Sequence, residues 1–267
     1  MQRTALVTGA SSGIGQATAA ALVARGFRVL GTSRHPSALR EDQRPDGVGF
    51  LPLDLGDDAS IEALAAAAGP VDVLVNNAGE SQNGPLEDLP LDALRRLFQV
   101  NVLGPVRLAQ LLLPGMRERR FGRVVMVGSM LASFPLAYRS SYVASKAALK
   151  GFSDGARHEY TPFGVWLTTV EPGSISTGIS ERRTRYVADD SPHKADFERM
   201  LAALDRNERA GAPASRVAAT IVKAIEAPRP KPFYAVGSNA PVVFPLRRLL
   251  PQSLISKATH RRHDLPR

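Results

Sequence analysis

The sequence predicts an α/β protein with a single domain, in which a doubly wound parallel sheet of about seven strands carries helices on both faces. Three observations predict this fold. The chain has 267 residues and 44% of them are hydrophobic, which suits one domain with a full core. Short apolar segments alternate with longer helical segments, as is typical of a parallel sheet covered on both faces. The first apolar segment runs directly into a glycine-rich turn that opens a helix.

Seven short, largely apolar segments are expected to form the strands. Ala-rich or Leu-rich stretches of helical character separate them, the first over residues 13–25. The expected strands are residues 4–8, 27–33, 48–53, 71–76, 123–129, 165–170 and 233–236. Right-handed crossovers between such strands place ligands at the carboxyl ends of the strands.

Two segments lie outside this alternation. Residues 178–211 are charged and fit no strand, so we expect an inserted substrate lid there, within a cofactor-binding and catalytic domain over residues 1–240. Residues 241–267 carry six Arg or Lys against one Asp, a large part of the net charge of +9. We interpret this segment as a solvated basic tail, because its charges do not alternate with aromatic residues as on a nucleic-acid-binding surface.

A glycine loop follows the first expected strand. Gly9, Gly13 and Gly15 lie in TGASSGIG, where glycines let the backbone turn sharply and approach a pyrophosphate closely. The helix that begins here offers free N–H groups and a partial positive charge. Ser11 and Ser12 can add hydroxyl donors to phosphate or ribose oxygens. A plain strand–helix turn would need only one or two glycines, so the loop favours a dinucleotide site.

The spacing of these glycines and several later motifs resemble the short-chain dehydrogenase/reductase family, whose members have a Rossmann fold. The motifs occur in the family's order over residues 4–177. They are TGASSGIG, Asn76-Asn77-Ala78-Gly79, Asn101 in VNVLG, Ser129, Tyr142 with Lys146 in YxxxK, and Pro172-Gly173 followed by Thr177. The resemblance implies an oxidoreductase that acts on a CH–OH group with a nicotinamide cofactor.

Tyr142 and Lys146 are expected to be the acid–base pair. They are four residues apart on an expected helix, so they share one face. A tyrosine titrates near pH ~10, and a lysine cation beside it favours the phenolate, which brings the pKa closer to the operating pH. In isolation, two such residues are more often surface neighbours.

The resemblance implies roles for two further residues. Ser129 would hold the substrate oxygen while charge develops on it, and Asn101 would hold a water that links Lys146 to solvent. Lys146 would also hydrogen-bond the nicotinamide ribose. In isolation, Ser129 could simply end a strand, Asn101 could face solvent, and Thr177 could cap a helix.

The cofactor is expected to be NADP(H). NAD enzymes place an acidic residue at the end of the second strand, whereas here Ser33 occupies that position and Arg34 follows, which suits a 2′-phosphate. Arg34 could instead be a solvent-facing arginine. The expected cofactor-binding residues are Gly9, Ser11, Ser12, Gly13, Ile14, Gly15, Arg34, Asp54, Leu55, Asn76, Ala78, Gly79, Tyr142, Lys146, Pro172, Gly173 and Thr177.

The substrate is expected to be a hydrophobic carbonyl or secondary alcohol, steroid-, retinoid- or ketone-like. The expected pocket walls are residues 131–139, residues 80–85, Ser174, Ile175 and the lid, in which Ile179, Tyr186, Phe197, Met200 and Leu201 are apolar. The segment 233–256 is similar, loosely, to the C-terminal region of the family's retinol and hydroxysteroid dehydrogenases.

Two other functions stay open at this point. One is a nucleotide-sensing regulatory protein with the same fold, although such a protein would not need Tyr142. The other is a nucleic-acid or membrane-surface binder that uses the basic segment. We expect a cytoplasmic protein that forms a homodimer or homotetramer. No metal site, disulfide, signal peptide or membrane insertion is expected, because there is no cysteine and no long apolar stretch.

Overall fold

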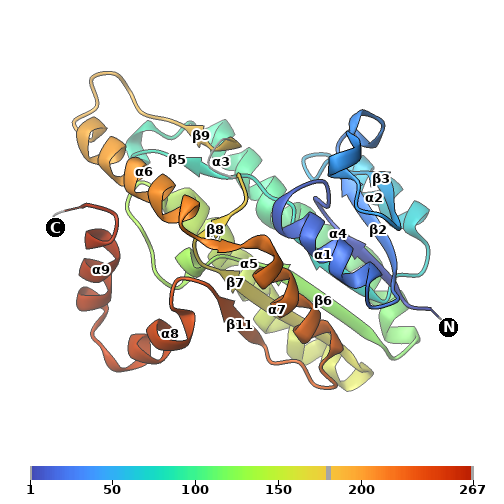
Figure 1. The fold of residues 1–267 in the computed structure, drawn as a ribbon. Coiled ribbons are helices and arrows are strands. Elements are labelled where there is room, and N and C mark those ends of the chain that lie inside the picture. The colour runs from blue at the N-terminus through green and yellow to red at the C-terminus, as the bar shows by residue number, and fades with distance from the viewer. Residues whose placement is uncertain (1, 179–181, 266–267) are drawn as a thin grey trace.

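Seven parallel strands form the central sheet of the computed structural model, which describes residues 2–178 and 182–265 (Figure 1). The strand order is β11-β7-β6-β4-β1-β2-β3. The strands are β1 (Thr4–Val7), β2 (Arg28–Ser33), β3 (Val48–Pro52), β4 (Val73–Asn76), β6 (Gly122–Val127), β7 (Val165–Pro172) and β11 (Phe233–Val236). The predicted doubly wound sheet is therefore confirmed, with strand ends that differ from the expected ones by up to two residues.

Consecutive residues of each strand alternate between two apolar cores, one on each face of the sheet. Leu6 and Leu74 face the core formed with α2 (Asp58–Ala68), α4 (Gly104–Glu118) and α5 (Ser140–Tyr160). Ala5 and Val75 face the core formed with α1 (Gly13–Val23) and α7 (Ala214–Glu226). Strands buried on both faces explain why the sequence shows continuous apolar segments instead of an alternating pattern.

Small elements gather at the carboxyl edge of the sheet. The helix α3 (Leu91–Phe98) continues into a π-helical turn, η4 (Gln99–Leu103), and then into α4. Two pairs of two-residue strands follow the large strands, β5 (Gln82–Asn83) with β9 (Thr184–Arg185), and β8 (Ile175–Ser176) with β10 (Ala212–Pro213). The short 3-10 helices are η1 (Pro36–Ala38), η2 (Glu41–Gln43), η3 (Leu86–Asp88), η5 (Met130–Ala132) and η6 (Thr161–Phe163).

The expected lid is more ordered than its sequence indicates. The expectation that it fits no strand is wrong, since β9 lies within it and pairs with β5. Its main element is α6 (Lys194–Arg209), which buries Phe197 and Met200 and exposes most of its charged residues, although Asp205 and Glu208 are largely buried. β9 has only two residues, which is too short a segment to show a strand pattern in the sequence. It is recognised only by its pairing with β5 in the structure.

The C-terminal segment is folded, so the interpretation as a solvated tail is wrong. It forms α8 (Ala240–Leu249), which packs near β11, and α9 (Gln252–Arg261), which lies beside α6 (Figure 1). Leu265 belongs to the same apolar cluster as Phe197 of α6, and Arg206 forms an ion pair with Asp264. Ile255 of α9 is buried, whereas Val242, Leu246, Leu249 and Leu254 are exposed together with most of the basic residues.

Candidate active site

The glycine loop between β1 and α1 forms a close turn that side chains would block. Gly9 and Gly13 have φ values of +66° and +55°, which favour glycine. A Cβ on Gly15 would lie 2.2 Å from the carbonyl oxygen of Gly9 and 2.5 Å from Nδ2 of Asn77. Ser12 precedes α1, and its side chain accepts no hydrogen bond from the helix. The first N–H groups of α1 are thus available to an anion.

Hydrogen bonds fasten this loop to the neighbouring strands. The Thr8 hydroxyl accepts hydrogen bonds from the N–H groups of Asn77 and Ala78, each 2.9 Å long. On the other side, the N–H groups of Gly9 and Ala10 donate to the hydroxyl and carbonyl oxygens of Thr32, at 3.2 and 3.0 Å. The end of β2 therefore lies against the loop.

Arg34 follows β2 on this edge, and its side chain is exposed. Asp54 lies two residues beyond β3, where its Oδ1 accepts a 2.8 Å hydrogen bond from the N–H of Gly56, and Leu55 is buried beside it. Asn76 is buried at the end of β4, where its Nδ2 donates a 3.0 Å hydrogen bond to the Pro105 carbonyl. Its side chain thus holds α4 to β4.

The segment after β7 reaches the other side of the glycine loop. The Gly173 N–H donates to the Val236 carbonyl at 2.8 Å, and a Cβ on Gly173 would lie 2.3 Å from the Ser238 hydroxyl. A Cβ on Gly13 would lie 3.2 Å from Cβ of Thr177. The predicted loop residues and Pro172-Gly173-Thr177 are therefore brought together around the N-terminus of α1.

Tyr142 and Lys146 are buried on the same face of α5, with exposed fractions of 8% and 5%. The Lys146 ammonium donates a 3.0 Å hydrogen bond to the Val127 carbonyl at the end of β6 and lies 5.9 Å from the centre of the Tyr142 ring. Ser129 lies two residues beyond β6, where its hydroxyl oxygen accepts a 3.2 Å hydrogen bond from the Leu131 N–H. The expected arrangement of these residues at the carboxyl edge is therefore present.

Asn101 lies in the π-helical turn η4 and fixes the loop after β4. Its Oδ1 accepts from the Glu80 N–H at 2.8 Å, and its Nδ2 donates to the Glu80 carbonyl at 2.9 Å and to the Ser145 hydroxyl at 3.1 Å. That hydroxyl in turn donates to the Tyr142 carbonyl at 2.8 Å. Asn101 thus positions α5, and both Nδ2 hydrogens are already used by protein atoms. The water-holding role expected for Asn101 could therefore involve only its Oδ1 or its backbone.

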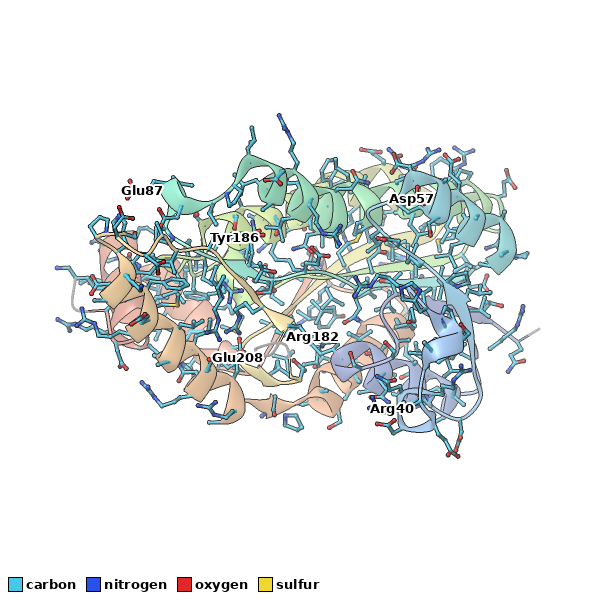
Figure 2. The ribbon with its side chains drawn as sticks, turned by 90° about the horizontal axis from the view of Figure 1, so that it is seen from above. Arg40, Asp57, Glu87, Arg182, Tyr186 and Glu208 are labelled. Atoms are coloured by element: carbon cyan, nitrogen blue, oxygen red, sulfur yellow. The ribbon has the colours of Figure 1, made fainter. Side chains whose placement is uncertain are left out.

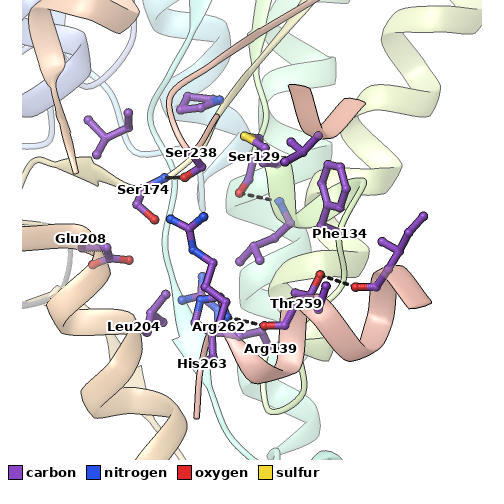
Figure 3. Close-up of a pocket in the computed structure, with 18 of the residues that line it drawn as sticks. Ser129, Phe134, Arg139, Ser174, Leu204, Glu208, Ser238, Thr259, Arg262 and His263 are labelled. Atoms are coloured by element: carbon purple, nitrogen blue, oxygen red, sulfur yellow. Dashed lines mark hydrogen bonds between the residues drawn. The ribbon is translucent and has the colours of Figure 1, made fainter. Parts of the chain in front are cut away.

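A cavity of about 380 Å³ opens beside Ser129 and Tyr142 (Figure 3). Ser81, Leu131, Arg139, Ser174 and Ile175 line it, as expected for the segments that contain them. The lid contributes Leu204 and Glu208 of α6, whereas Phe197, Met200 and Leu201 belong to the core beneath. Ile179 lies outside the described residues.

The C-terminal helices complete this cavity, and their contribution to its wall was not expected from the sequence. The lining residues from these helices and their flanks are Val243, Leu246, Arg247, Leu250, Leu254, Ile255, Ala258, Thr259, Arg262 and His263. Their apolar members recur three or four residues apart, a helical pattern that could have revealed them.

Two arginines after residue 181 hold the lid segment in place. Arg182, labelled in Figure 2, donates a 3.0 Å hydrogen bond to the Ser12 hydroxyl of the glycine loop. Arg183 is fully buried and pairs with Asp205 at 2.7 Å and Glu208 at 2.5 Å. Burial raises the pKa of Glu208, and the nearby Arg183 opposes that rise.

The described residues, 2–178 and 182–265, contain no cluster of three or more side chains that could hold a metal ion. Within the same ranges, every helix is too short or too polar to cross a bilayer.

Comparison with known proteins gives a consistent result. The family described as short chain dehydrogenase matches residues 3–187. "Uncharacterized oxidoreductase YusZ" of Bacillus subtilis is 34% identical, over 94% of this chain and 95% of that protein. "NADPH-dependent 3-dehydrocapnine reductase" of Ornithobacterium rhinotracheale is 30% identical, over 96% and 95%. The crystal structure of a short-chain dehydrogenase from Streptomyces avermitilis is similar with a TM-score of 0.82 at 36% identity, covering 97% of this chain and 95% of that one.

Proposed function

Because this chain belongs to the short-chain dehydrogenase/reductase family, we propose that it is an NADP(H)-dependent oxidoreductase that interconverts a hydrophobic secondary alcohol and its ketone. The observation that carries this proposal is the burial of Tyr142 and Lys146 on one face of α5, with Ser129 and Tyr142 lining one cavity. A steroid-, retinoid- or ketone-like molecule would suit the mainly apolar lining of that cavity.

The glycine loop fits the pyrophosphate of a dinucleotide. Its backbone leaves no room for a Cβ on Gly15, and the free N–H groups at the start of α1 suit an anion. Gly9, Ser11, Ser12, Gly13, Ile14 and Gly15 would hold the phosphates. Gly79 and Lys146 would hold the nicotinamide side, since a Cβ on Gly79 would lie 3.5 Å from the Lys146 ammonium. When bound, NADP(H) supplies the hydride for the reaction.

Arg34 is the residue that favours NADP(H) over NAD(H). It is exposed and follows β2, the strand whose Thr32 contacts the glycine loop, and no acidic residue occupies the end of β2. A guanidinium binds a 2′-phosphate with two hydrogen bonds, whereas a carboxylate there would repel it. The name of the relative from Ornithobacterium rhinotracheale, an NADPH-dependent reductase, supports the same choice.

Tyr142 would donate the proton during reduction. As the carbonyl oxygen gains negative charge, the phenolic O–H transfers its proton to that oxygen, and in the oxidative direction the phenolate takes it back. Lys146 uses one N–H for the Val127 carbonyl, which keeps its charge close to Tyr142.

Ser129 would stabilise the substrate oxygen. Its hydroxyl oxygen already accepts the N–H of Leu131, so the hydroxyl proton is left to donate to an oxygen in the cavity. A donor aimed at the atom where charge develops lowers the barrier without reorganisation.

The proposal is tested by the loss of NADPH absorbance when the purified protein is mixed with long-chain, steroid and retinoid carbonyl compounds, with NADH in parallel. We expect turnover of at least one of these compounds and a preference for NADPH of about tenfold or more. A preference for NADH, or no turnover in the whole series, would contradict it. We also propose a cytoplasmic homodimer or homotetramer, which light scattering of the purified protein tests for the oligomeric state.

A further inference from the structure

Arg139 is a buried cation with unused hydrogen-bond donors. Its exposed fraction is 3%, and it lines the cavity that also contains Tyr142. Nη2 donates to the Ser81 hydroxyl at 3.2 Å, whereas Nε and Nη1 have no acceptor among the described residues. Burial lowers the pKa of Arg139 to about 10, so the guanidinium is charged at neutral pH. A buried charge with unpaired donors is costly for stability and points to an absent partner.

The nearest carboxylates are already paired with another cation. Asp205 and Glu208 both pair with the buried Arg183, at 2.7 and 2.5 Å. The same cavity wall contains Arg262, which forms no ion pair among the residues described (Figure 3). The cavity is therefore positively charged near Arg139.

Much of the remaining cavity lining is apolar, and this apolar part extends toward solvent. Phe134 and Val243 line it, with Leu246, Leu250 and Leu254 of the C-terminal helices. These three leucines are 43–50% exposed, so the apolar lining continues to the rim of the cavity. An apolar chain could follow these leucines from the cavity toward solvent.

We propose that Arg139 binds an anionic group of an amphipathic substrate, a carboxylate, phosphate or sulfonate, whose apolar chain lies along α8 and α9. The guanidinium carbon lies 4.4 Å from the centre of the Tyr142 ring, so this group is located a few bonds from the carbon that reacts. The proposal rests on the proposed function, because it takes the cavity beside Tyr142 as the substrate site. An anion would accept hydrogen bonds from Nε and Nη1 of Arg139, as in the bidentate geometry that arginine favours.

The test is calorimetric binding of four probes with the same ten-carbon chain, decanoate, decyl phosphate, decyl sulfonate and decanol, to the NADPH-loaded protein. We expect at least one anionic probe to bind about 10- to 100-fold more tightly than decanol. The ranking among the three anions then identifies the group. In Arg139→Gln this preference should disappear while decanol binds as before. Arg209→Gln, at the exposed end of α6, is the matched control and should keep the preference.

Stability separates a binding role from a structural one. If Arg139 serves the substrate, Arg139→Gln should unfold at the same or a higher temperature, because it removes a buried cation. Equal binding of decanoate, decyl phosphate, decyl sulfonate and decanol by the wild type would overturn the proposal, as would equal loss of decanol and anion binding in Arg139→Gln. If Arg139→Gln does not fold, Arg139 is structural and the proposal is wrong. Binding of these probes requires no turnover. A protein that binds anionic probes but reduces no carbonyl compound would therefore contradict the proposed function alone, and a protein that reduces carbonyl compounds but does not prefer anionic probes would contradict the Arg139 proposal alone.

Discussion

Arg182 donates a 3.0 Å hydrogen bond to the hydroxyl of Ser12, a residue 170 positions earlier in the chain. This contact joins the segment after β7 to the loop where the cofactor phosphates are proposed to bind. The hydrogen bond is exposed to solvent, so it contributes little to stability. Its consequence is a cation held at the loop that we propose binds the cofactor phosphates.

The first prediction concerns this cation. Arg182→Gln should weaken NADPH binding by roughly 2- to 5-fold, because an exposed charge interaction is lost, and should reduce the salt dependence of binding. A fluorescence titration at two salt concentrations measures both effects. Arg185→Gln removes an exposed arginine three residues away and serves as control. If both variants bind NADPH as the wild type does, Arg182 does not contact the cofactor.

The second prediction concerns cofactor choice. Arg34→Asp should reduce NADPH affinity by about 10- to 100-fold, since a charged hydrogen bond is replaced by repulsion, and should affect NADH far less. Arg28→Asp makes the same charge change at the opposite end of β2 and should leave both affinities nearly unchanged. Parallel titrations with the two cofactors decide the matter, and an equal loss for both would refute the assignment.

The third prediction concerns the loop after β4. A Cβ on Gly79 would lie 2.9 Å from Oδ1 of Asn101, whose amide is fixed by three hydrogen bonds and cannot move aside freely. Gly79→Ala should therefore lower kcat by about 10- to 100-fold through a small displacement of α5. In Gly151→Ala the new methyl group meets open space on the same helix, so kcat should not change. Steady-state kinetics of the two variants make the comparison.

The fourth prediction concerns acid pH. Burial lowers the pKa of His263, and the cations of Arg262, Arg139 and His260 act in the same direction. A lowered folded-state pKa means that the contribution of His263 to stability is present above the unfolded value, near 6.5, and is lost as the pH falls through the folded value. The C-terminal helix α9 should therefore loosen below about pH 6.

Amide exchange of residues 252–265, corrected for the intrinsic rate, measures this loosening. The wild type and His158→Gln, which alters an exposed histidine on α5, should lose protection between pH 7 and pH 5. His263→Gln should keep its protection over the same pH range, because glutamine does not titrate. The same loss in His263→Gln would show that another group is responsible.

The central sheet and the glycine loop could be predicted because their signals are local. Each strand is a short apolar segment, and the positive φ of Gly9 and the approach of Gly15 to the Gly9 carbonyl are constraints within one loop. The strand ends were less accurate because neighbouring elements determine them. Ser129, for example, was expected within a strand, but it caps a short helix two residues beyond β6.

The substrate side of the site could not be predicted in the same way. Arg139 lies at the end of the expected pocket wall 131–139, but its burial depends on packing between segments distant in the sequence. The basic residues of the C-terminal segment drew attention to charge, although Leu246, Leu250 and Leu254 at helical spacing carried the structural information. Asn101 was identified, but its bonds to Glu80 depend on contacts between distant segments.

The central claim, acid–base catalysis by Tyr142, is tested most directly by kcat of Tyr142→Phe on a substrate that the wild type reduces. This variant keeps the ring and removes only the proton, so kcat should fall by about 10²- to 10⁴-fold while NADPH affinity is retained. Tyr160→Phe makes the same change at the far end of α5 and should have kcat like the wild type. A kcat for Tyr142→Phe within a factor of about three of the wild-type value would contradict the account.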